Sequence, residues 1–393
     1  MLVLFWIAFA LLLYLYVGYP ALAWVRAQCC PRPRPRRLPP ADYAVTVIVV
    51  AHNEEDRIRP RLDNLLALDY PKDKLEILLA SDGSTDGTVA RACEYNEADV
   101  RIRPFAARRG KAAVLNEVIP SARGEIVVLA DARQRFEPGA LRALVRNFGD
   151  PQVGAVSGTL TLTPSADGAT VGKGTCFYWR YESFIRRCES RAGSTVGATG
   201  AIYAIRRDLF EPMPPDTILD DVLIPLRIVR RGYRVQLEPA ARAHDAATTT
   251  EHGEFTRKVR TIAGTFQLFS RERWLVNPFR NPLWFETMSH KALRLAAPVL
   301  QGVVFGANAG LASSVFYRPV LAAQIVFYVA ALGGFVRRHR RHRVYVLTVP
   351  YTMCLLNWAT VVGCVRFLGG RQRATWEQVP SRIRRAAPSE FAR

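Results

Sequence analysis

The chain has 393 residues, a hydrophobic fraction of 49% and a formal net charge of +20 at pH 7. A disordered chain would be less apolar and a plain soluble enzyme less charged, so the composition indicates apolar segments flanked by basic ones. The seven Cys show no C-x-x-C spacing. They argue against a disulfide framework and a zinc site, and favour a reduced, cytosolic main domain.

Residues 1–25 carry no charge and are long enough to cross a bilayer as a helix. The triplet Ala21-Leu22-Ala23 looks like a signal-peptide cleavage site, but a signal peptide needs a basic start and a shorter apolar core. We therefore predict a transmembrane anchor over 1–25. A Pro/Arg linker follows at 26–42, and its Arg residues place that end of the anchor in the cytosol.

From Val45 onward, short β-branched runs alternate with helical periods, which is typical of a mostly parallel sheet flanked by helices. This pattern predicts an α/β domain over 43–270. Helices are expected near 221–231 and 254–269. Strands are expected at 45–51, 75–81, 99–105, 125–131, 153–162, 201–205 and 233–237.

The last part of the chain is apolar and basic. An interfacial amphipathic helix is expected within 271–294, transmembrane helices over 295–368, and a basic tail over 369–393. Three C-terminal spans would place the tail on the outer side of the membrane, whereas the positive-inside bias predicts a cytosolic tail. One stretch could therefore be re-entrant. The Arg-rich runs border these apolar stretches, so anionic lipid headgroups are their expected partner, and no nucleic acid is expected.

Polar residues follow the first two predicted strands. Asn53 and Glu54 come directly after the first strand, and Asp82 ends the second. The carboxyl ends of parallel strands meet at one crevice, where ligands bind in open α/β sheets. The other reading is that Asp82-Gly83-Ser84-Thr85 forms only a turn and a helix cap.

The next two strand ends add charged groups. Lys111 opens a helix after Arg108-Arg109-Gly110, a position that favours a diphosphate. Asp131 stands at the tip of the fourth strand, two residues before Arg133. A carboxylate beside a nucleotide site is a reasonable ligand for Mg²⁺ or Mn²⁺.

The order of these motifs resembles glycosyltransferase family 2, of the membrane-embedded kind that includes cellulose, chitin, hyaluronan and poly-N-acetylglucosamine synthases. The resemblance covers about residues 43–270. It implies a GT-A-type nucleotide-sugar-binding domain inserted between an N-terminal transmembrane helix and C-terminal ones. The matching residues are Ala51-His52-Asn53-Glu54, Asp82 to Thr88, Gly110-Lys111, Leu115-Asn116, Asp131-Ala132-Arg133, Gly200 to Tyr203, and Leu219-Asp220-Asp221.

The resemblance also implies roles for single residues. Lys111 would bind the donor phosphates, and Asp131 the divalent metal. The uridine would be held by Asn53, Glu54 and Asp82. Asp221 falls where the family's Thr-Glu-Asp motif keeps its general base, and Asp220 replaces the Glu.

The chemistry of transfer supports Asp221 independently. A sugar hydroxyl has a high pKa, so a carboxylate must accept its proton as it attacks the anomeric carbon. One direct displacement inverts that carbon. The other reading is that Asp220 and Asp221 only interact with the dipole at a helix start.

Three features depart from the family pattern or leave a choice open. Arg133 replaces the second Asp of the metal motif, so metal binding should be weakened and Arg133 could contact phosphate or water. The Gln-x-x-Arg-Trp motif of processive synthases appears as Arg257-Lys258-Val259-Arg260-Thr261, where only Arg260 survives. Arg257 and Arg260, with Asp220, are weaker candidates for acceptor or phosphate contacts. His244 is a surface or structural residue in preference to a metal ligand.

We therefore expect a plasma-membrane (inner-membrane), multi-pass inverting glycosyltransferase. Its cytosolic domain would move a sugar from a nucleotide donor, expected to be a UDP-sugar, to a growing polysaccharide, with export or synthase subunits as further partners. One alternative is a non-processive transferase that glycosylates a lipid carrier. The other is a non-catalytic membrane subunit of a synthase complex.

Overall fold

The protein is described from a computed structural model. Most of the expected linker at 26–42, most of the Arg-rich run at 337–343 and most of the tail at 369–393 lie outside the described residues. Those described are 1–32, 43–95, 100–163, 172–246, 251–337, 345–372 and 375.

Within the described part of the chain, the strands form one eight-stranded sheet in the order β3-β2-β1-β4-β7-β6-β8-β5. The central strand β1 (Val45–Ala51) pairs in parallel with its two neighbours, and β2 pairs in parallel with β3. Strand β7 joins β4 antiparallel. The remaining bounds are β2 Leu75–Asp82, β3 Val100–Phe105, β4 Ile126–Asp131, β5 Arg135–Phe136, β6 Val153–Thr163, β7 Ile202–Arg206 and β8 Arg234–Ala246.

The sheet is covered on both faces because its central strands are apolar without interruption. In β1, Val47 and Val49 point into one core, and Ile48 and Val50 point into the other. Successive strand residues face opposite sides, so a run of apolar residues requires helices on both. The first core includes α3 (Glu55–Leu66) and α6 (Ala140–Val145), and the second α5 (Lys111–Val118) and α8 (Asp220–Arg230). The expected mostly parallel α/β fold is confirmed.

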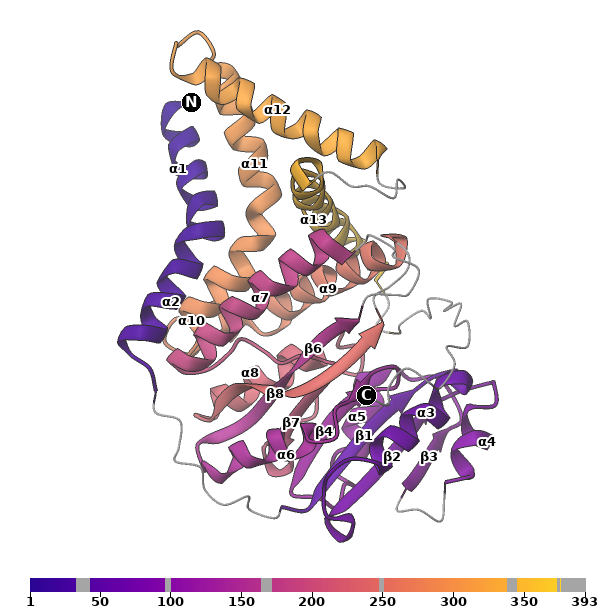
Figure 1. The fold of residues 1–393 in the computed structure, drawn as a ribbon. Helices are drawn as coiled ribbons and strands as arrows, with labels where there is room; N and C mark the ends of the chain where they lie inside the picture. The colour runs from indigo at the N-terminus through magenta and orange to yellow at the C-terminus, as the bar shows by residue number, and fades with distance from the viewer. Residues whose placement is uncertain are drawn as a thin grey trace.

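Two long helices lie between the sheet and the apolar helices (Figure 1). Helix α7 (Gly172–Ala192) packs against α2 (Tyr19–Cys29), and α9 (Glu251–Arg271) packs along α13 (Tyr345–Leu368). Helices α7 and α9 therefore lie between the α/β domain and the candidate membrane spans (Figure 1).

Four helices are long and apolar enough to cross a membrane, among the residues described: Leu2–Cys29, Trp284–Gly310, Tyr317–Val336 and Val346–Leu368. They indicate a multi-pass membrane protein. The first joins α1 (Leu2–Leu13), a π-helical stretch (Tyr14–Gly18) and α2; the second joins α10 (Trp284–Glu286), a π-helical stretch (Thr287–Ala292) and α11 (Leu293–Gly310). The amphipathic segment expected up to residue 294 thus continues without a break into a candidate span, while α12 (Tyr317–Val336) and α13 supply the other two.

A buried polar cluster joins the first and second candidate spans to α7. The His290 ring, which is fully buried, lies 2.6 Å from Glu189 Oε1 and 3.0 Å from Glu182 Oε1. The Tyr19 hydroxyl donates to the same Glu189 oxygen at 2.5 Å. Buried charges require such partners, so this cluster specifies where the membrane helices meet α7.

Candidate active site

Asp82 folds the loop after β3 onto the tip of β2. Its carboxylate is fully buried and accepts hydrogen bonds from the backbone N–H groups of Arg109, at 2.6 Å, and Gly110, at 2.9 Å. The next residue, Gly83, has a φ of +61°, and a Cβ there would lie 2.3 Å from the backbone nitrogen of Arg108. Asp82 therefore organises two loops of the crevice, and the nucleotide contact predicted for it stays a prediction.

The loop after β1 is tied to the loop after β2. Asn53, with a φ of 53°, accepts from the Thr85 backbone N–H through Oδ1 at 2.8 Å. The Glu54 backbone N–H donates to Thr88 Oγ1 at 2.8 Å, and the Glu54 carboxylate pairs with Arg57 at 2.6 Å. Asn tolerates this left-handed backbone better than most residues do. The crevice edge expected to receive the nucleoside is thus built by local hydrogen bonds.

Lys111 brings three distant segments together. The lysine begins α5, and its Nζ lies 3.1 Å from Asp131 Oδ1 at the end of β4 and 3.2 Å from Asp220 Oδ2 at the start of α8. Burial opposes the charge of Lys111, but the carboxylates of Asp131, Asp220 and Asp221 outweigh it and raise the lysine pKa. The structure therefore gathers the predicted phosphate-binding, metal-binding and catalytic positions around one ammonium.

Asp131 is ionised in this setting. Burial alone would raise its carboxyl pKa, but the positive charges of Lys111 and Arg133 hold the pKa below its usual value. The side chain keeps 37% of its surface exposed. It is therefore an anionic carboxylate that a donor complex could reach, and its role as a metal ligand stays a prediction.

Asp221 lies next to Asp220 in the same charged cluster. Burial, followed by the negative charges of Asp220 and Asp131, raises its carboxyl pKa to about 6, against the opposing charges of Lys111 and Arg186. Its Oδ2 accepts from the Gly200 backbone N–H at 3.1 Å, an approach that a Cβ at residue 200 would crowd. A carboxylate with this pKa is ionised at neutral pH and is more basic than an ordinary Asp.

Arg186 of α7 supports the loop that contacts Asp221, and no motif in the sequence pointed to this residue. Its guanidinium donates to Thr199 Oγ1 at 2.7 Å and to the Gly197 carbonyl at 3.3 Å. The Tyr203 hydroxyl, buried on β7, donates to Asp220 Oδ2 at 3.3 Å. Asp220 therefore has a hydrogen-bond partner on β7, and the loop that donates to Asp221 is held by α7.

Arg133 points toward β8. Its Nε lies 3.1 Å from Asp245 Oδ2, an oxygen that also accepts from Gln134 Nε2 at 3.1 Å. The Arg133 side chain is 35% exposed, so a ligand can still reach it. Asp245, which the sequence did not single out, is its partner, and the phosphate contact predicted for Arg133 stays a prediction.

The buried Arg61 side chain contacts the segment that follows Arg133. It is 2% exposed, lies 4.2 Å from the ring centroid of Phe136 and donates to the Gln134 carbonyl at 2.6 Å. Burial lowers its guanidinium pKa to about 9, although the charge of Asp131 partly opposes this. The segment between Asp131 and Phe136 therefore lies on a buried cation.

Two further predicted residues lie on α9, and His244 lies on β8. Burial lowers the Arg260 pKa, while Asp220 and Asp221 raise it, which places Arg260 within electrostatic reach of the carboxylates. Arg257 Nη2 lies 3.0 Å from Glu254 Oε2. His244 Nε2 lies 2.9 Å from Glu137 Oε1, a structural pairing at β8.

Comparison with known proteins shows which family this fold and cluster resemble. Residues 46–213 match the model described as Glycosyl transferase family 2. Over these residues the chain is similar to glycosyltransferase family 2.

Named relatives and a solved structure agree with this assignment. The chain is 28% identical over 234 residues to poly-beta-1,6-N-acetyl-D-glucosamine synthase of Staphylococcus aureus (strain MSSA476), and 25% identical over 236 residues to that of Staphylococcus epidermidis. Each match covers 58% of this chain and only 56% of the relative's length. The mannosyltransferase PcManGT from Pyrobaculum calidifontis, solved with GDP-Man and Mn²⁺, superposes with a TM-score of 0.71 and 26% identity over 94% of this chain and 99% of that one.

Proposed function

We propose that the protein is an inverting glycosyltransferase in which Asp221 is the general base. The observation that carries this is the placement of Asp221 directly after Asp220, whose carboxylate meets Asp131 across Lys111, with Asp221 Oδ2 held by the Gly200 N–H at 3.1 Å. Burial in this cluster raises the Asp221 pKa to about 6. The acceptor hydroxyl would attack the anomeric carbon and give its proton to Asp221. The bond from that carbon to the diphosphate oxygen would break, and its electron pair would leave with the nucleotide. The anomeric centre would be inverted in this single step.

The leaving diphosphate needs positive charge as the bond breaks. Lys111 is held by two carboxylates and is charged, so it would contact the phosphates of the donor. Arg133 forms an ion pair with Asp245 and would add a second cation at the edge of the same region. Asn53, Glu54 and Asp82 would form the nucleoside end through their interlocked loops.

A divalent cation fits this site only with help from the donor. In the part of the chain that the structure describes, no group of three or more His, Cys, Asp or Glu side chains could hold a metal. Asp131 would be its single protein ligand, and the donor phosphates would supply the others. When bound, Mg²⁺ or Mn²⁺ would neutralise charge on the diphosphate.

We propose a UDP-sugar as the donor and a growing polysaccharide as the acceptor. The named relatives are synthases of poly-beta-1,6-N-acetyl-D-glucosamine, and inversion of an α-linked nucleotide sugar gives a β-linkage. GDP-mannose is the second donor to test, because the solved mannosyltransferase that contains it matches nearly the whole chain.

One observation favours a second acceptor class. The chain has Arg257, Arg260 and Thr261 where processive synthases have Gln-x-x-Arg-Trp, so the element expected to hold a polymer is altered. Transfer of one sugar to a lipid carrier is therefore the alternative. Arg257 and Arg260, on α9, could then face the phosphate of that carrier.

The membrane arrangement is proposed from charge. The basic residues after the first candidate span would be cytosolic by the positive-inside rule, which places the transferase region, about 43–270, on the cytosolic face of the plasma membrane. The Arg-rich runs would then contact anionic headgroups. Export of the product beside the membrane helices, alone or with synthase subunits, is part of the same proposal.

The test is to supply the full-length protein, reconstituted in lipid, with UDP-sugars and GDP-mannose. Release of UDP or GDP and the size of the product would be measured in parallel. UDP release with a long product supports the proposal, and a single-sugar glycolipid supports the alternative acceptor. No release above that of Asp221→Asn with any donor would contradict catalysis and favour a non-catalytic subunit.

A further inference from the structure

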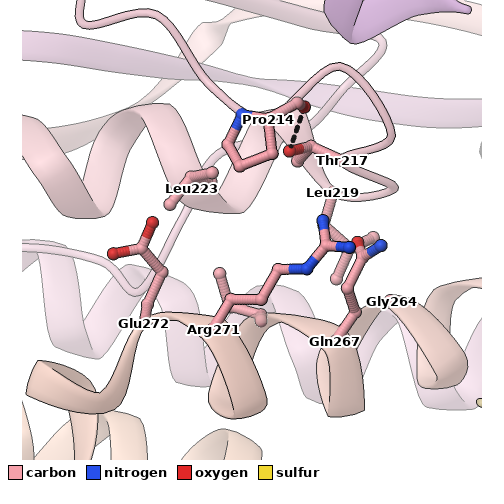
Figure 2. A pocket seen from close by; sticks show the side chains of 9 residues that line it. Pro214, Thr217, Leu219, Leu223, Gly264, Gln267, Arg271 and Glu272 are labelled. Carbon is pink, nitrogen blue, oxygen red and sulfur yellow. Dashed lines mark hydrogen bonds between the residues drawn. The ribbon is translucent and has the colours of Figure 1, made fainter.

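The loop that leads into the carboxylate pair is held by α9. Gln267 accepts a hydrogen bond from the Ile218 backbone N–H at 3.0 Å through Oε1, and donates through Nε2 to the Asp216 carbonyl at 3.0 Å. Figure 2 shows Gln267 and Arg271 on α9, facing the loop at Thr217 and Leu219. One side-chain amide thus pairs with both a donor and an acceptor of the backbone just before Asp220.

Two neighbours on the same face of α9 complete the contact. The Arg271 guanidinium pairs with both oxygens of Asp216, at 2.7 and 2.6 Å. At Gly264, a Cβ would lie only 2.7 Å from Leu219 Cγ, so the absence of a side chain lets the loop approach the helix. The ion pair is exposed and contributes little alone. The Gln267 amide is the part of this contact whose loss would leave the N–H of the buried Ile218 without its partner.

The other end of this loop is held by the helix that carries Lys111. Asn116 of α5 donates to the Met213 carbonyl at 2.7 Å and accepts from the Met213 backbone N–H at 2.9 Å. The segment from Met213 to Ile218 is therefore fixed to α5 at its start and to α9 at its end. This double attachment sets where α8 begins, and so where Asp220 meets Lys111 at 3.2 Å.

We propose that Gln267 is a positioning residue for the general base Asp221, acting through the backbone of Asp216 and Ile218. This inference rests on the proposed function. Gln267 touches neither donor nor reacting atoms, and its removal would let the start of α8 shift. A displacement of about 1 Å in a catalytic group can cost on the order of a hundredfold in rate.

Helix α9 is itself fixed from the membrane side. The rings of Phe266 and Phe367 stack with centroids 6.0 Å apart, and a Cβ at Gly363 would lie 2.8 Å from Ile262 Cγ2. The amide of Gln267 is therefore presented from a helix that α13 holds in place. Weakening the amide contact should displace the loop and leave α9 where it is.

The experiment compares Gln267→Met, which keeps the length of the side chain and removes both hydrogen bonds, with Ser270→Ala, an exposed control on the same helix. Lipid-reconstituted protein would be assayed for kcat, the donor KM, the calorimetric Kd of the free nucleotide and the melting temperature. We expect kcat to fall about tenfold to a hundredfold in Gln267→Met. The nucleotide Kd and donor KM should stay near wild type, and Ser270→Ala should behave as wild type.

A kcat near wild type in folded Gln267→Met, or an equal loss of nucleotide binding and turnover, would overturn the inference. If that variant does not fold, Gln267→Glu decides, because its carboxylate keeps the acceptor for Ile218 and loses the donor for Asp216. An intermediate kcat with unchanged nucleotide Kd supports positioning, and wild-type kcat contradicts it. Asp221→Asn, run in parallel, separates the two claims: if it stays active, the proposed base is wrong whatever Gln267 does.

Discussion

The Lys111 ammonium lies 3.2 Å from the Asp220 carboxylate, and this contact joins the start of α5 to the start of α8. Strand order brings them together, because α5 leads into β4 and α8 follows β7, and β4 and β7 are neighbours. The proposed phosphate end of the site and its proposed base are thereby parts of one charge network. A change at Lys111 should therefore alter the electrostatics of the carboxylate pair.

Removal of the lysine charge should weaken donor binding. Lys111→Met leaves the carboxylates without their ammonium partner and removes the cation proposed to contact phosphate. Charge-assisted hydrogen bonds contribute about 1.5–3 kcal/mol, so the nucleotide Kd should rise about tenfold to a hundredfold. Calorimetric titration of UDP and GDP would measure it, with Lys111→Arg as the charge-preserving control. An unchanged Kd in folded Lys111→Met would mean that the lysine only holds the two aspartates together.

The pH profile of turnover should report the carboxylate pair. A base with a pKa of about 6 cannot accept a proton once protonated, so kcat should fall as pH drops below about 6. Arg186 opposes this raised pKa, so Arg186→Gln should move the acid limb of the profile to higher pH. Steady-state rates from pH 5 to 8, measured at saturating donor, would test this. A limb that stays in place, or moves down, would show that Arg186 does not act on the base.

Replacement of Asp82 should have two separable effects. Asp82→Ala leaves the N–H groups of Arg109 and Gly110 without their carboxylate, which should lower stability by about 1–3 kcal/mol. The proposed contact with the nucleoside predicts a higher nucleotide Kd as well. Thermal unfolding and calorimetry on the same variant would measure both. Lower stability with an unchanged Kd would identify Asp82 as a turn residue alone.

Arg133→Ala tests the altered metal motif. The substitution leaves Asp245 without its ion-pair partner and removes a cation from the edge of the phosphate region. We expect a higher donor KM and a stronger demand for added Mg²⁺ or Mn²⁺. Asp245→Asn is the matched control, since it breaks the same pair and keeps the guanidinium. Unaltered donor kinetics and metal titration in Arg133→Ala would place Arg133 outside the reaction.

Much of the fold and of the candidate site could be predicted from the sequence, because the strands are apolar and chemically informative residues stand at their ends. Lys111, Asp131 and Asp221 are each adjacent to a strand or helix end, and such ends converge in an open sheet. Their actual contacts could not be predicted. The bridge from Lys111 to both Asp131 and Asp220 depends on the order of strands in space.

The supporting residues were missed for a physical reason. Arg61, Arg186 and Gln267 lie inside helices. In the sequence, a single polar residue in a helix cannot be distinguished from one on its solvent-exposed face. Their roles come from long-range packing: Arg61 lies beneath Gln134, Arg186 beside Thr199, and Gln267 beside Ile218. Only the three-dimensional arrangement brings these pairs together.

The most direct measurement is single-turnover transfer by Asp221→Asn with radiolabelled donor, alongside a nucleotide titration. The amide keeps the shape of the carboxylate but cannot accept the acceptor proton. We predict that transfer falls by about 10²–10⁴, as is common for loss of a general base, while the nucleotide Kd stays nearly unchanged. Transfer near the wild-type rate in the folded variant would contradict Asp221 as the general base.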